Sequence, residues 1–129
     1  MRPLFLVVDD HEDIRKLVKA MLLSNECDCE VAADGQEAVE LLEKPENAER
    51  FTGILLDVMM PRMNGYEVLK QIQEWQHTTD IPVIMLTAKG EGDDIIEGYN
   101  NGADYYIPKP FTHEQIAYGL EIIMGEEND

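Results

Sequence analysis

Short apolar runs alternate with amphipathic stretches along the chain, and the alternation repeats five times. Short apolar runs favour buried strands, whereas apolar residues spaced three and four positions apart predict one face of a helix. The expected strands are residues 4–8, 30–33, 53–56, 81–86 and 104–107. The helices expected after them carry their apolar positions within residues 14–22, 38–42, 68–75, 95–99 and 116–123.

Three of the expected helices also carry a start signal, in which a short polar residue is followed three positions later by Glu or Gln. These pairs are Asp34 with Glu37, Asn64 with Glu67, and Thr112 with Gln115. The polar segment 44–50 contains Pro45 and is expected to be a loop.

Strands that are almost entirely apolar are buried on both faces, which is typical of a parallel sheet, and parallel neighbours need crossover helices. The sequence therefore predicts an α/β fold with helices on both faces of a five-stranded parallel sheet. A length of 129 residues fits one such domain. We expect the domain to span residues 1–125, with 126–129 as an acidic C-terminal tail.

The chain carries 10 Lys and Arg residues against 27 Asp and Glu residues, a formal net charge of −17. Nucleic acids and anionic membrane surfaces repel such a chain, so direct binding to either is not expected. The excess of acid has two interpretations that the composition leaves open. It keeps the domain soluble, or some of the carboxylates gather to hold a cation.

Cys27 and Cys29 are the only cysteines, and their spacing suits neither a disulfide framework nor a four-ligand zinc site. Reduced thiols in a cytoplasm are the simplest interpretation. No signal peptide is visible, and the apolar runs 4–8 and 81–86 are too short to span a bilayer. A soluble, cytoplasmic protein is therefore expected.

Chemically active side chains follow four of the five expected strands: Asp9 with Asp10, then Asp57, Thr87 and Lys109. In open α/β sheets, ligands bind at the carboxyl ends of the strands, so these side chains are expected to meet at one edge. Three carboxylates at close range repel one another, and a bound Mg²⁺ removes the conflict. An ammonium and a hydroxyl suit phosphoryl oxygens, so the set matches the needs of phosphoryl transfer to a carboxylate.

Four motifs, in this order, resemble the receiver-domain family of bacterial response regulators, and the resemblance covers about residues 4 to 124. They are Asp9-Asp10, Asp57-Val-Met-Met-Pro-Arg-Met-Asn-Gly65, Thr87-Ala88, and Gly102-Ala-Asp-Tyr-Tyr-Ile-Pro-Lys-Pro-Phe111. The resemblance implies a flavodoxin-like sheet with strand order 2-1-3-4-5. It also implies a phosphoacceptor that promotes its own phosphorylation and dephosphorylation and is not otherwise an enzyme.

By this resemblance, Asp57 accepts a phosphoryl group from a histidine kinase or a phosphotransfer protein. Mg²⁺ is implied to be held by Asp9, Asp10, Asp57 and the backbone carbonyl of Met59. Such a site makes the chain a switch in a two-component phosphorelay.

The same resemblance implies that Thr87 and Lys109 bind the phosphoryl oxygens and that Tyr106 changes rotamer when Thr87 moves. The Lys109–Pro110 bond is implied to be cis.

Residues 89–102 form a weak helical pattern with Gly98 inside it, and a glycine inside a helix costs about 1 kcal/mol of stability relative to alanine. We hypothesise that phosphorylation reorders this fourth helix and changes the face that it forms with the fifth strand and the last helix. A downstream protein partner or a fused output domain would read that face, and homodimers formed on phosphorylation are compatible with it.

Each site residue also has a purely structural interpretation when it is taken alone. Asp9, three positions before Glu12, is a candidate helix cap, and Asp57 is a candidate strand end. Thr87 alone suits a strand end that packs its methyl group, and Lys109 alone suits a solvated surface position.

The three histidines, His11, His77 and His113, lie in unrelated segments without metal-ligand spacing, so surface or capping positions are expected. His11 is close enough to the acidic pair to affect metal affinity slightly. Lys89, two positions after Thr87, is expected to alter the lifetime of the phosphoryl group.

Other function classes are less well matched by these residues. A hydrolytic phosphatase of the aspartyl-phosphate type needs an Asp-x-Asp motif after the first strand and a substrate cap, and neither is found. A constitutive interaction module of the same fold has typically lost Asp57, one acid of the pair or Lys109. A nucleotide or flavin carrier would need a Gly-rich or Ser/Thr-rich phosphate loop after the first strand, and none follows it.

The last expected helix lacks basic residues, which favours a stand-alone receiver or one excised from a larger protein such as a hybrid kinase.

Overall fold

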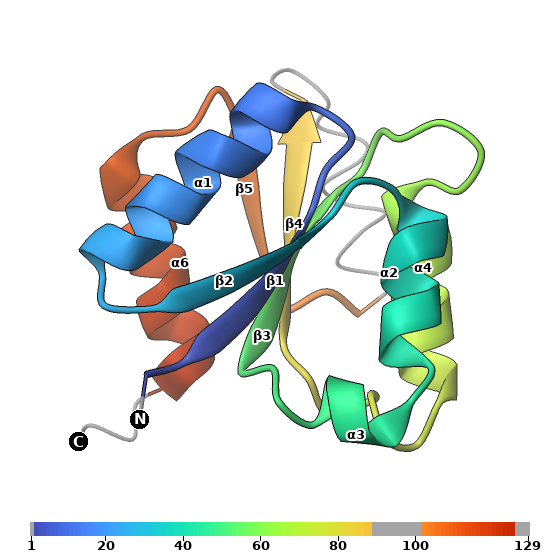
Figure 1. Ribbon diagram of the computed structural model, residues 1–129. Helices are drawn as coiled ribbons and strands as arrows, with labels where there is room; N and C mark the ends of the chain where they lie inside the picture. Colours follow the sequence, from blue (N-terminus) through green and yellow to red (C-terminus); the bar gives the residue numbers. More distant parts are fainter. Residues whose placement is uncertain (1, 89–101, 126–129) are drawn as a thin grey trace.

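The computed structural model describes residues 2–88 and 102–125 of the chain. Within these residues, one five-stranded sheet runs through the molecule in the order β2-β1-β3-β4-β5 (Figure 1). Its strands are β1 (Leu4–Val8), β2 (Asp28–Ala32), β3 (Gly53–Asp57), β4 (Val83–Ala88) and β5 (Tyr105–Lys109). The strand order implied by the resemblance is therefore confirmed.

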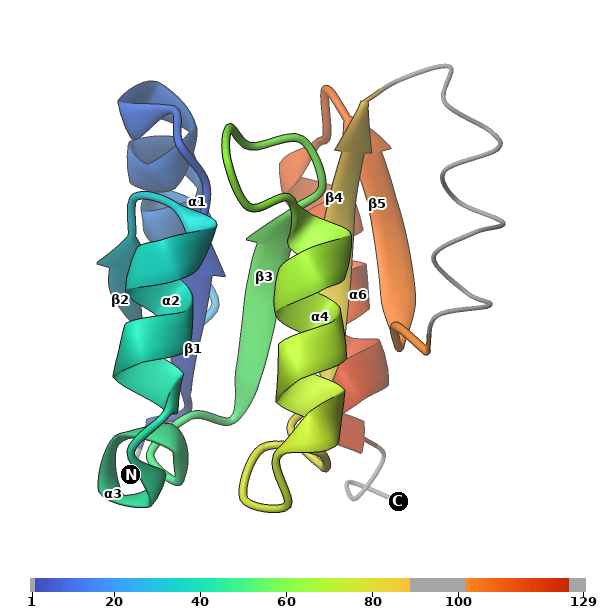
Figure 2. The same ribbon diagram turned by 90° about the vertical axis from the view of Figure 1, so that its right-hand side faces the viewer.

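All the strand pairings are parallel, so the carboxyl ends of the strands lie at the same edge of the sheet, at the top of Figure 2. β1 lies between β2 and β3, with Phe5 opposite Cys29 of β2 on one side and Gly53 of β3 on the other. β3 continues the sheet by placing Asp57 opposite Leu86 of β4. Residues that follow different strands are thus brought to one edge.

Helices cover both faces of the sheet (Figure 1). On one face lie α1 (Glu12–Ser24) and α6 (His113–Met124), and on the other lie α2 (Gly35–Leu42) and α4 (Gly65–Glu74). The short helix α3 (Pro45–Ala48) connects α2 to β3.

The core is divided into two apolar clusters by the sheet. In β1, Phe5 and Val7 pack in the cluster under α1 and α6, whereas Leu6 and Val8 pack in the cluster under α2 and α4. All four side chains are fully buried. Successive residues of a strand face opposite sides, so a strand covered on both faces has to be apolar throughout. This is why β1 matches the expected strand at both ends.

The segment 44–50, expected to be a loop, contains α3, and that prediction was wrong. Pro45 occupies the first turn of this helix. The fixed φ angle of proline and its missing N–H suit the first turn of a helix, where the N–H has no helical partner. A proline in a polar segment is therefore compatible with a helix start as well as with a loop.

The bounds of the four strands other than β1 differ from the sequence prediction, and β3 does so only by including Asp57 as its last residue. β2 begins at Asp28 rather than residue 30, because it pairs there with the first residue of β1. β4 spans Val83–Ala88 rather than 81–86, because the Ile81 N–H still closes a turn onto the Thr78 carbonyl. β5 extends through Lys109, so this lysine ends a strand rather than following it.

The three helix-start signals are confirmed. The side chains of Asp34, Asn64 and Thr112 each accept a hydrogen bond from the backbone N–H three positions later. At Asn64 and Thr112, the side chain of that later residue also accepts from the backbone of the capping residue, which completes a capping box.

We expect Asn64→Ala to destabilise the fold by about 1 kcal/mol. The Asn64 Oδ1 atom accepts the Glu67 N–H at 3.0 Å, and alanine leaves that donor without a protein partner. Asn64→Ser keeps a capping oxygen and is expected to stay within about 0.5 kcal/mol of the native chain. Urea denaturation followed by Trp75 fluorescence measures both. Equal losses in the two variants would contradict a capping role.

The expected helix with apolar positions 95–99, including Gly98, lies outside the described residues, as do Lys89 and the segment 126–129. Among the helices that the structure describes, none combines the length and the apolar character needed to cross a bilayer.

Candidate functional site

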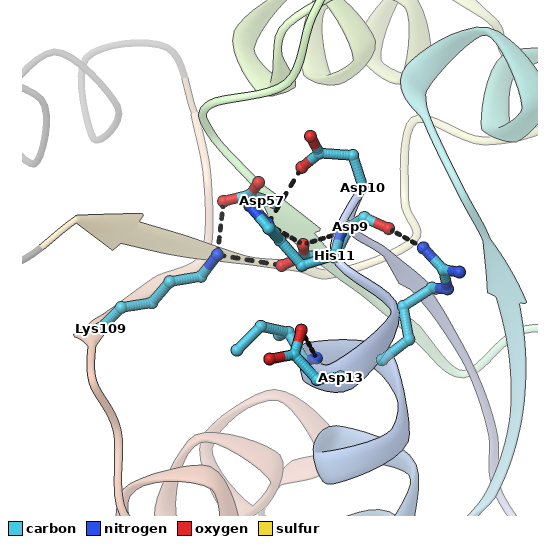
Figure 3. Close-up of polar contacts among 8 residues, drawn as sticks. Asp9, Asp10, His11, Asp13, Asp57 and Lys109 are labelled. Carbon is cyan, nitrogen blue, oxygen red and sulfur yellow. Dashed lines mark hydrogen bonds and ion pairs between the residues drawn. The ribbon is translucent and has the colours of Figure 1, made fainter.

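The acidic residues predicted to meet at the sheet edge do meet there (Figure 3). Asp9 and Asp10 follow β1, Asp57 ends β3, and His11 joins them as the first residue before α1. Each of the four offers one oxygen or nitrogen atom, and these atoms all lie within 4.8 Å of one another. Some of the excess carboxylates therefore gather at one site, as the second interpretation of the acidic composition required.

Lys109 reaches this cluster from the end of β5. Its Nζ lies 3.0 Å from Asp9 Oδ2 and 3.0 Å from Asp57 Oδ1. The Asp9 side chain is fully buried, that of Asp57 is 4% exposed and that of Lys109 is 21% exposed. Lys109 is thus an internal counter-ion rather than a solvated surface lysine. One ammonium faces two buried carboxylates, and the cluster keeps an excess of negative charge.

The environment of Asp57 opposes ionisation of its carboxyl group. Burial raises the pKa of Asp57 to about 6, the hydrogen bond from Lys109 works against this rise, and the negative charge of Asp9 adds to it. Burial alone would lower the pKa of Lys109, but its hydrogen bonds to Asp57 and Asp9 outweigh burial and raise it. Lys109 therefore stays charged while it holds the two carboxylates.

Two buried oxygen atoms at this edge have no hydrogen-bond partner among the described residues. They are Asp57 Oδ2 and Thr87 Oγ1. Thr87 follows Leu86, which lies opposite Asp57 in the sheet, so both atoms belong to neighbouring strand ends. Buried polar atoms without a partner are costly, and such atoms in a native fold commonly mark the place of a bound ion or ligand.

The backbone after β1 aims Asp9 into the site. Asp9 Oδ1 accepts the His11 N–H at 2.9 Å, and Arg15 donates a hydrogen bond to the Asp9 carbonyl oxygen at 2.7 Å. The capping position of α1 is occupied by His11, whose side chain makes no capping hydrogen bond. The alternative interpretation of Asp9 as the helix cap is therefore wrong.

His11 contacts both members of the acidic pair. Its Nδ1 lies 3.1 Å from Asp9 Oδ1 and 3.2 Å from Asp10 Oδ1, while 59% of its side chain is exposed. The hydrogen bond to Asp9 raises the pKa of His11, and the charge of Asp10 raises it further. The sequence indicated that His11 lies near the acidic pair, because it directly follows Asp10, but it did not predict a contact of the ring with both carboxylates.

The other two histidines lie away from the cluster. His77 Nε2 is 2.9 Å from the Leu42 carbonyl oxygen, and His113 Nε2 is 3.0 Å from the Ser24 hydroxyl. Neither residue belongs to the four-residue group at the sheet edge.

Tyr106 is buried in the cluster under α2 and α4, opposite Met85 of β4. Met85 packs in the same cluster, and Thr87 lies two positions after it, so Thr87 shares its side of the sheet. The tyrosine and the threonine are therefore placed on one side of neighbouring strands. The Lys109–Pro110 bond is cis, as the resemblance implied.

The loop after β3 folds back closely on the end of that strand. The Gly65 N–H donates to the Val58 carbonyl at 2.8 Å, and the Val58 N–H donates to the Leu86 carbonyl at 3.1 Å. A Cβ atom at Gly65 would collide with the Asp57 carbonyl oxygen and lie 2.9 Å from the Val58 Cα. Only a residue without a side chain fits here. Met59, in the same loop, has an exposed side chain.

We expect Asp57→Asn to stabilise the metal-free protein by about 2 to 3 kcal/mol at neutral pH. The pKa of Asp57 is raised from 3.8 to about 6 on folding, so the folded state favours the protonated carboxyl. Below about pH 4 the Asp57 carboxyl is protonated in both the folded and the unfolded state, so it does not lower the free energy of unfolding. As the pH rises through 6, the native chain loses stability that the uncharged asparagine keeps.

Urea denaturation in EDTA at pH 4 and pH 7.5 measures this difference. Asp13→Asn is the control, because Asp13 is an exposed neighbour outside the cluster. A gap between Asp57→Asn and the native chain that stays constant with pH would contradict the buried, raised-pKa carboxyl.

Comparison with known proteins agrees with this geometry. The model of the "Response regulator receiver domain" family matches residues 5–121. The transcriptional regulatory protein SrrA of Staphylococcus aureus (strain NCTC 8325 / PS 47) is 40% identical over 119 residues, which cover 92% of this chain and 46% of SrrA. The chain thus spans about half the length of the curated relatives it matches.

Solved structures show the same relationship. The chemotaxis response regulator CheY4 of Vibrio cholerae is similar with a TM-score of 0.85 and 32% identity, over 95% of this chain and 99% of CheY4. The signal receiver domain of a signal transduction histidine kinase from Syntrophus aciditrophicus is similar with a TM-score of 0.83 and 28% identity, over 95% and 89% of the two chains. This chain belongs to the response regulator receiver domain family, the phosphoacceptor switches of two-component signalling.

Proposed function

We propose that Asp57 is the phosphoacceptor of this receiver and that the acidic cluster holds the Mg²⁺ that its phosphorylation requires. The observation that carries the proposal is the state of the Asp57 carboxylate. Oδ1 is held by Lys109 at 3.0 Å, while Oδ2 is buried and has no hydrogen-bond partner among the described residues. An oriented carboxylate oxygen that is shielded from water is suited to attack phosphorus.

The donor atoms of the cluster fit Mg²⁺. Carboxylate oxygens are its preferred protein ligands, and it commonly keeps several waters besides one or two carboxylates. We assign Asp9, Asp10, Asp57 and the backbone carbonyl of Met59 to this role. When bound, Mg²⁺ offsets negative charge on the phosphoryl oxygens and on the carboxylates.

Transfer begins when an Asp57 oxygen attacks the phosphorus of a phosphorylated donor. A bond forms between this oxygen and phosphorus, and the bond between phosphorus and the donor breaks. The donor keeps the electron pair and, if it is a histidine, leaves as an imidazole that takes up a proton. In a separate second step, a water oxygen attacks the same phosphorus, the bond between phosphorus and the Asp57 oxygen breaks, and phosphate leaves while the Asp57 carboxylate is restored. These two steps are the self-promoted phosphorylation and dephosphorylation expected of the chain.

Lys109 and Thr87 are placed to stabilise the transferred group. The Lys109 ammonium already touches an Asp57 oxygen, so a phosphoryl group attached to Asp57 would lie within its reach. The buried Thr87 hydroxyl has no hydrogen-bond partner among the described residues and is available to donate to a phosphoryl oxygen. Movement of Thr87 toward that oxygen is the proposed trigger for Tyr106, which packs on the same side of the sheet.

The proposed donor is a histidine kinase or a phosphotransfer protein, and the proposed reader is a downstream protein or an attached output domain. SrrA is named a transcriptional regulator, and this chain covers 46% of it, so an output domain of that kind is one form the reader would take. We propose no direct contact with nucleic acid or membrane by this chain, given its net charge of −17. A cytoplasmic location and homodimers formed on phosphorylation stay predictions.

Intact mass after incubation with acetyl phosphate tests the proposal. We expect a gain of one phosphoryl group in the presence of Mg²⁺ and none in EDTA. The absence of any gain would contradict self-catalysed phosphorylation. Beryllofluoride, which mimics a phosphoryl group on a carboxylate, then separates two alternatives: binding indicates a receiver that needs its cognate kinase, and no binding indicates a constitutive interaction module.

A further inference from the structure

His11 places an imidazole nitrogen beside the carboxylates of Asp9 and Asp10 (Figure 3). Its Nδ1 lies 3.1 Å from one carboxylate, Asp9 Oδ1, and 3.2 Å from another, Asp10 Oδ1. The ring comes from the residue directly after the acidic pair, and the Asp9 side chain accepts its backbone N–H. The position of the ring is therefore set by the same turn that positions the acids.

We propose that His11 Nδ1 is a nitrogen ligand of this site, which gives the site a higher affinity for Ni²⁺ and related late first-row cations than carboxylates alone would provide. The inference rests on the proposed cation site at Asp9, Asp10 and Asp57, and concerns which cations that site prefers. Imidazole nitrogen suits nickel, zinc and copper, whereas Mg²⁺ is bound through carboxylate, carbonyl and water oxygens.

The spacing of the donors fits a common cation. Neighbouring ligands of an octahedral ion with bonds of about 2.1 Å are about 3.0 Å apart. The distances from His11 Nδ1 to Asp9 and Asp10 are 3.1 and 3.2 Å, so the three atoms already have the separation of ligands on one side of such an ion. A neutral imidazole that carries its proton on Nε2 presents the Nδ1 lone pair that such a ligand needs.

A second observation points to a ligand at the same place. Asp57 is buried to more than nine-tenths, and its Oδ2 has no hydrogen-bond partner among the described residues. One oxygen of its carboxylate belongs to the same group as a ring nitrogen of His11, within the 4.8 Å that contains all four donors. The four residues therefore combine a nitrogen donor with a carboxylate that keeps one oxygen unpaired within the described part of the chain.

His11→Asn is the informative variant, because the asparagine amide can still donate a hydrogen bond to Asp9 but supplies no imidazole nitrogen. We expect this variant to bind Ni²⁺ about 10- to 100-fold more weakly than the native chain. Its affinity for Mg²⁺ is expected to change by less than about 3-fold, because Mg²⁺ gains little from a nitrogen ligand. Titration calorimetry of the full chain with each cation measures both.

Two further variants define the site. His113→Asn is the matched control, since His113 contacts Ser24 outside the cluster, and it should leave both affinities unchanged. Asp9→Asn should weaken both cations together. Binding of Ni²⁺ should also shift the His11 ring resonances in NMR spectra by paramagnetic contact, while those of His77 stay in place.

Two results would overturn this inference and leave the proposed function intact. One is an unchanged Ni²⁺ affinity in His11→Asn. The other is an equal loss of Mg²⁺ and Ni²⁺ affinity, which would make His11 a positioning residue for Asp9 and Asp10. Failure of the native chain to bind either cation would overturn the inference and the proposed Mg²⁺ site together.

Discussion

Asp57→Asn is expected to abolish the Mg²⁺-dependent gain of a phosphoryl group from acetyl phosphate. The asparagine amide has no anionic oxygen, so it does not attack phosphorus. The neighbouring acids do not replace it. Asp9 Oδ1 and Oδ2 are engaged by His11 and Lys109, and Asp10 is held beside the His11 ring. Intact mass measurements of this variant should therefore show only the unmodified chain, with any phosphorylated species below the detection limit of the instrument.

The design excludes unfolding as the cause of this loss. Removing the buried charge is expected to make Asp57→Asn more stable than the native chain in the absence of metal, so a silent variant would still be folded. Asp13→Asn removes a nearby exposed carboxylate and should be phosphorylated like the native chain. Persistent phosphorylation of Asp57→Asn would assign the phosphoacceptor to another residue, and peptide mapping would then locate it.

Gly65→Ala is expected to destabilise the fold by about 3 kcal/mol and to impair phosphorylation of the chain that remains folded. The added Cβ would collide with the Asp57 carbonyl oxygen and lie 2.9 Å from the Val58 Cα. Both are backbone atoms, so neither can move away by a rotamer change as an atom of a flexible side chain could. Relief of the collision has to move the end of β3, and the Asp57 carboxylate moves with it.

Gly119→Ala provides the comparison. A Cβ there would meet the side-chain ends of Ile107 and Ile84 at 3.1 and 3.2 Å, and these can shift. Alanine also favours a helix interior over glycine by about 1 kcal/mol, so the net change should be small. Urea denaturation measures stability and acetyl phosphate labelling measures the site. A Gly65→Ala chain as stable as Gly119→Ala would contradict the close approach behind Asp57.

The fold was predictable from the sequence because its strands are buried on both faces. The run 4–8 has no polar residue to blur its ends, and β1 is Leu4–Val8. β2 was harder to delimit, because it is an edge strand with polar residues at Asp28 and Glu30. Its first residue is set by pairing with Leu4, a partner far away in the sequence. Periodicity within one segment does not encode such pairing.

The site was predictable at the level of which side chains meet, but not of how they touch. Parallel strands bring Asp9, Asp57 and Lys109 to one edge, and topology alone is enough to foresee it. The contact of His11 with both acids depends on the turn between β1 and α1, whose backbone carries no repeating pattern. The wrong interpretation of Asp9 as a helix cap has the same origin, since a cap and a site residue share the same spacing to Glu12.

The strand order also determines when opposite charges meet as the chain is synthesised. A growing chain that has reached the end of β3 contains three of the five strands, β2-β1-β3, and with them Asp9 and Asp57. The ammonium that holds both carboxylates is 100 residues after Asp9 and 52 after Asp57. Until β5 pairs with β4, the two carboxylates lack the ammonium that neutralises them, and their mutual repulsion opposes closure of the partial sheet. Pairing of β5 with β4 thus adds the last strand of the sheet and the positive charge of the site in one event.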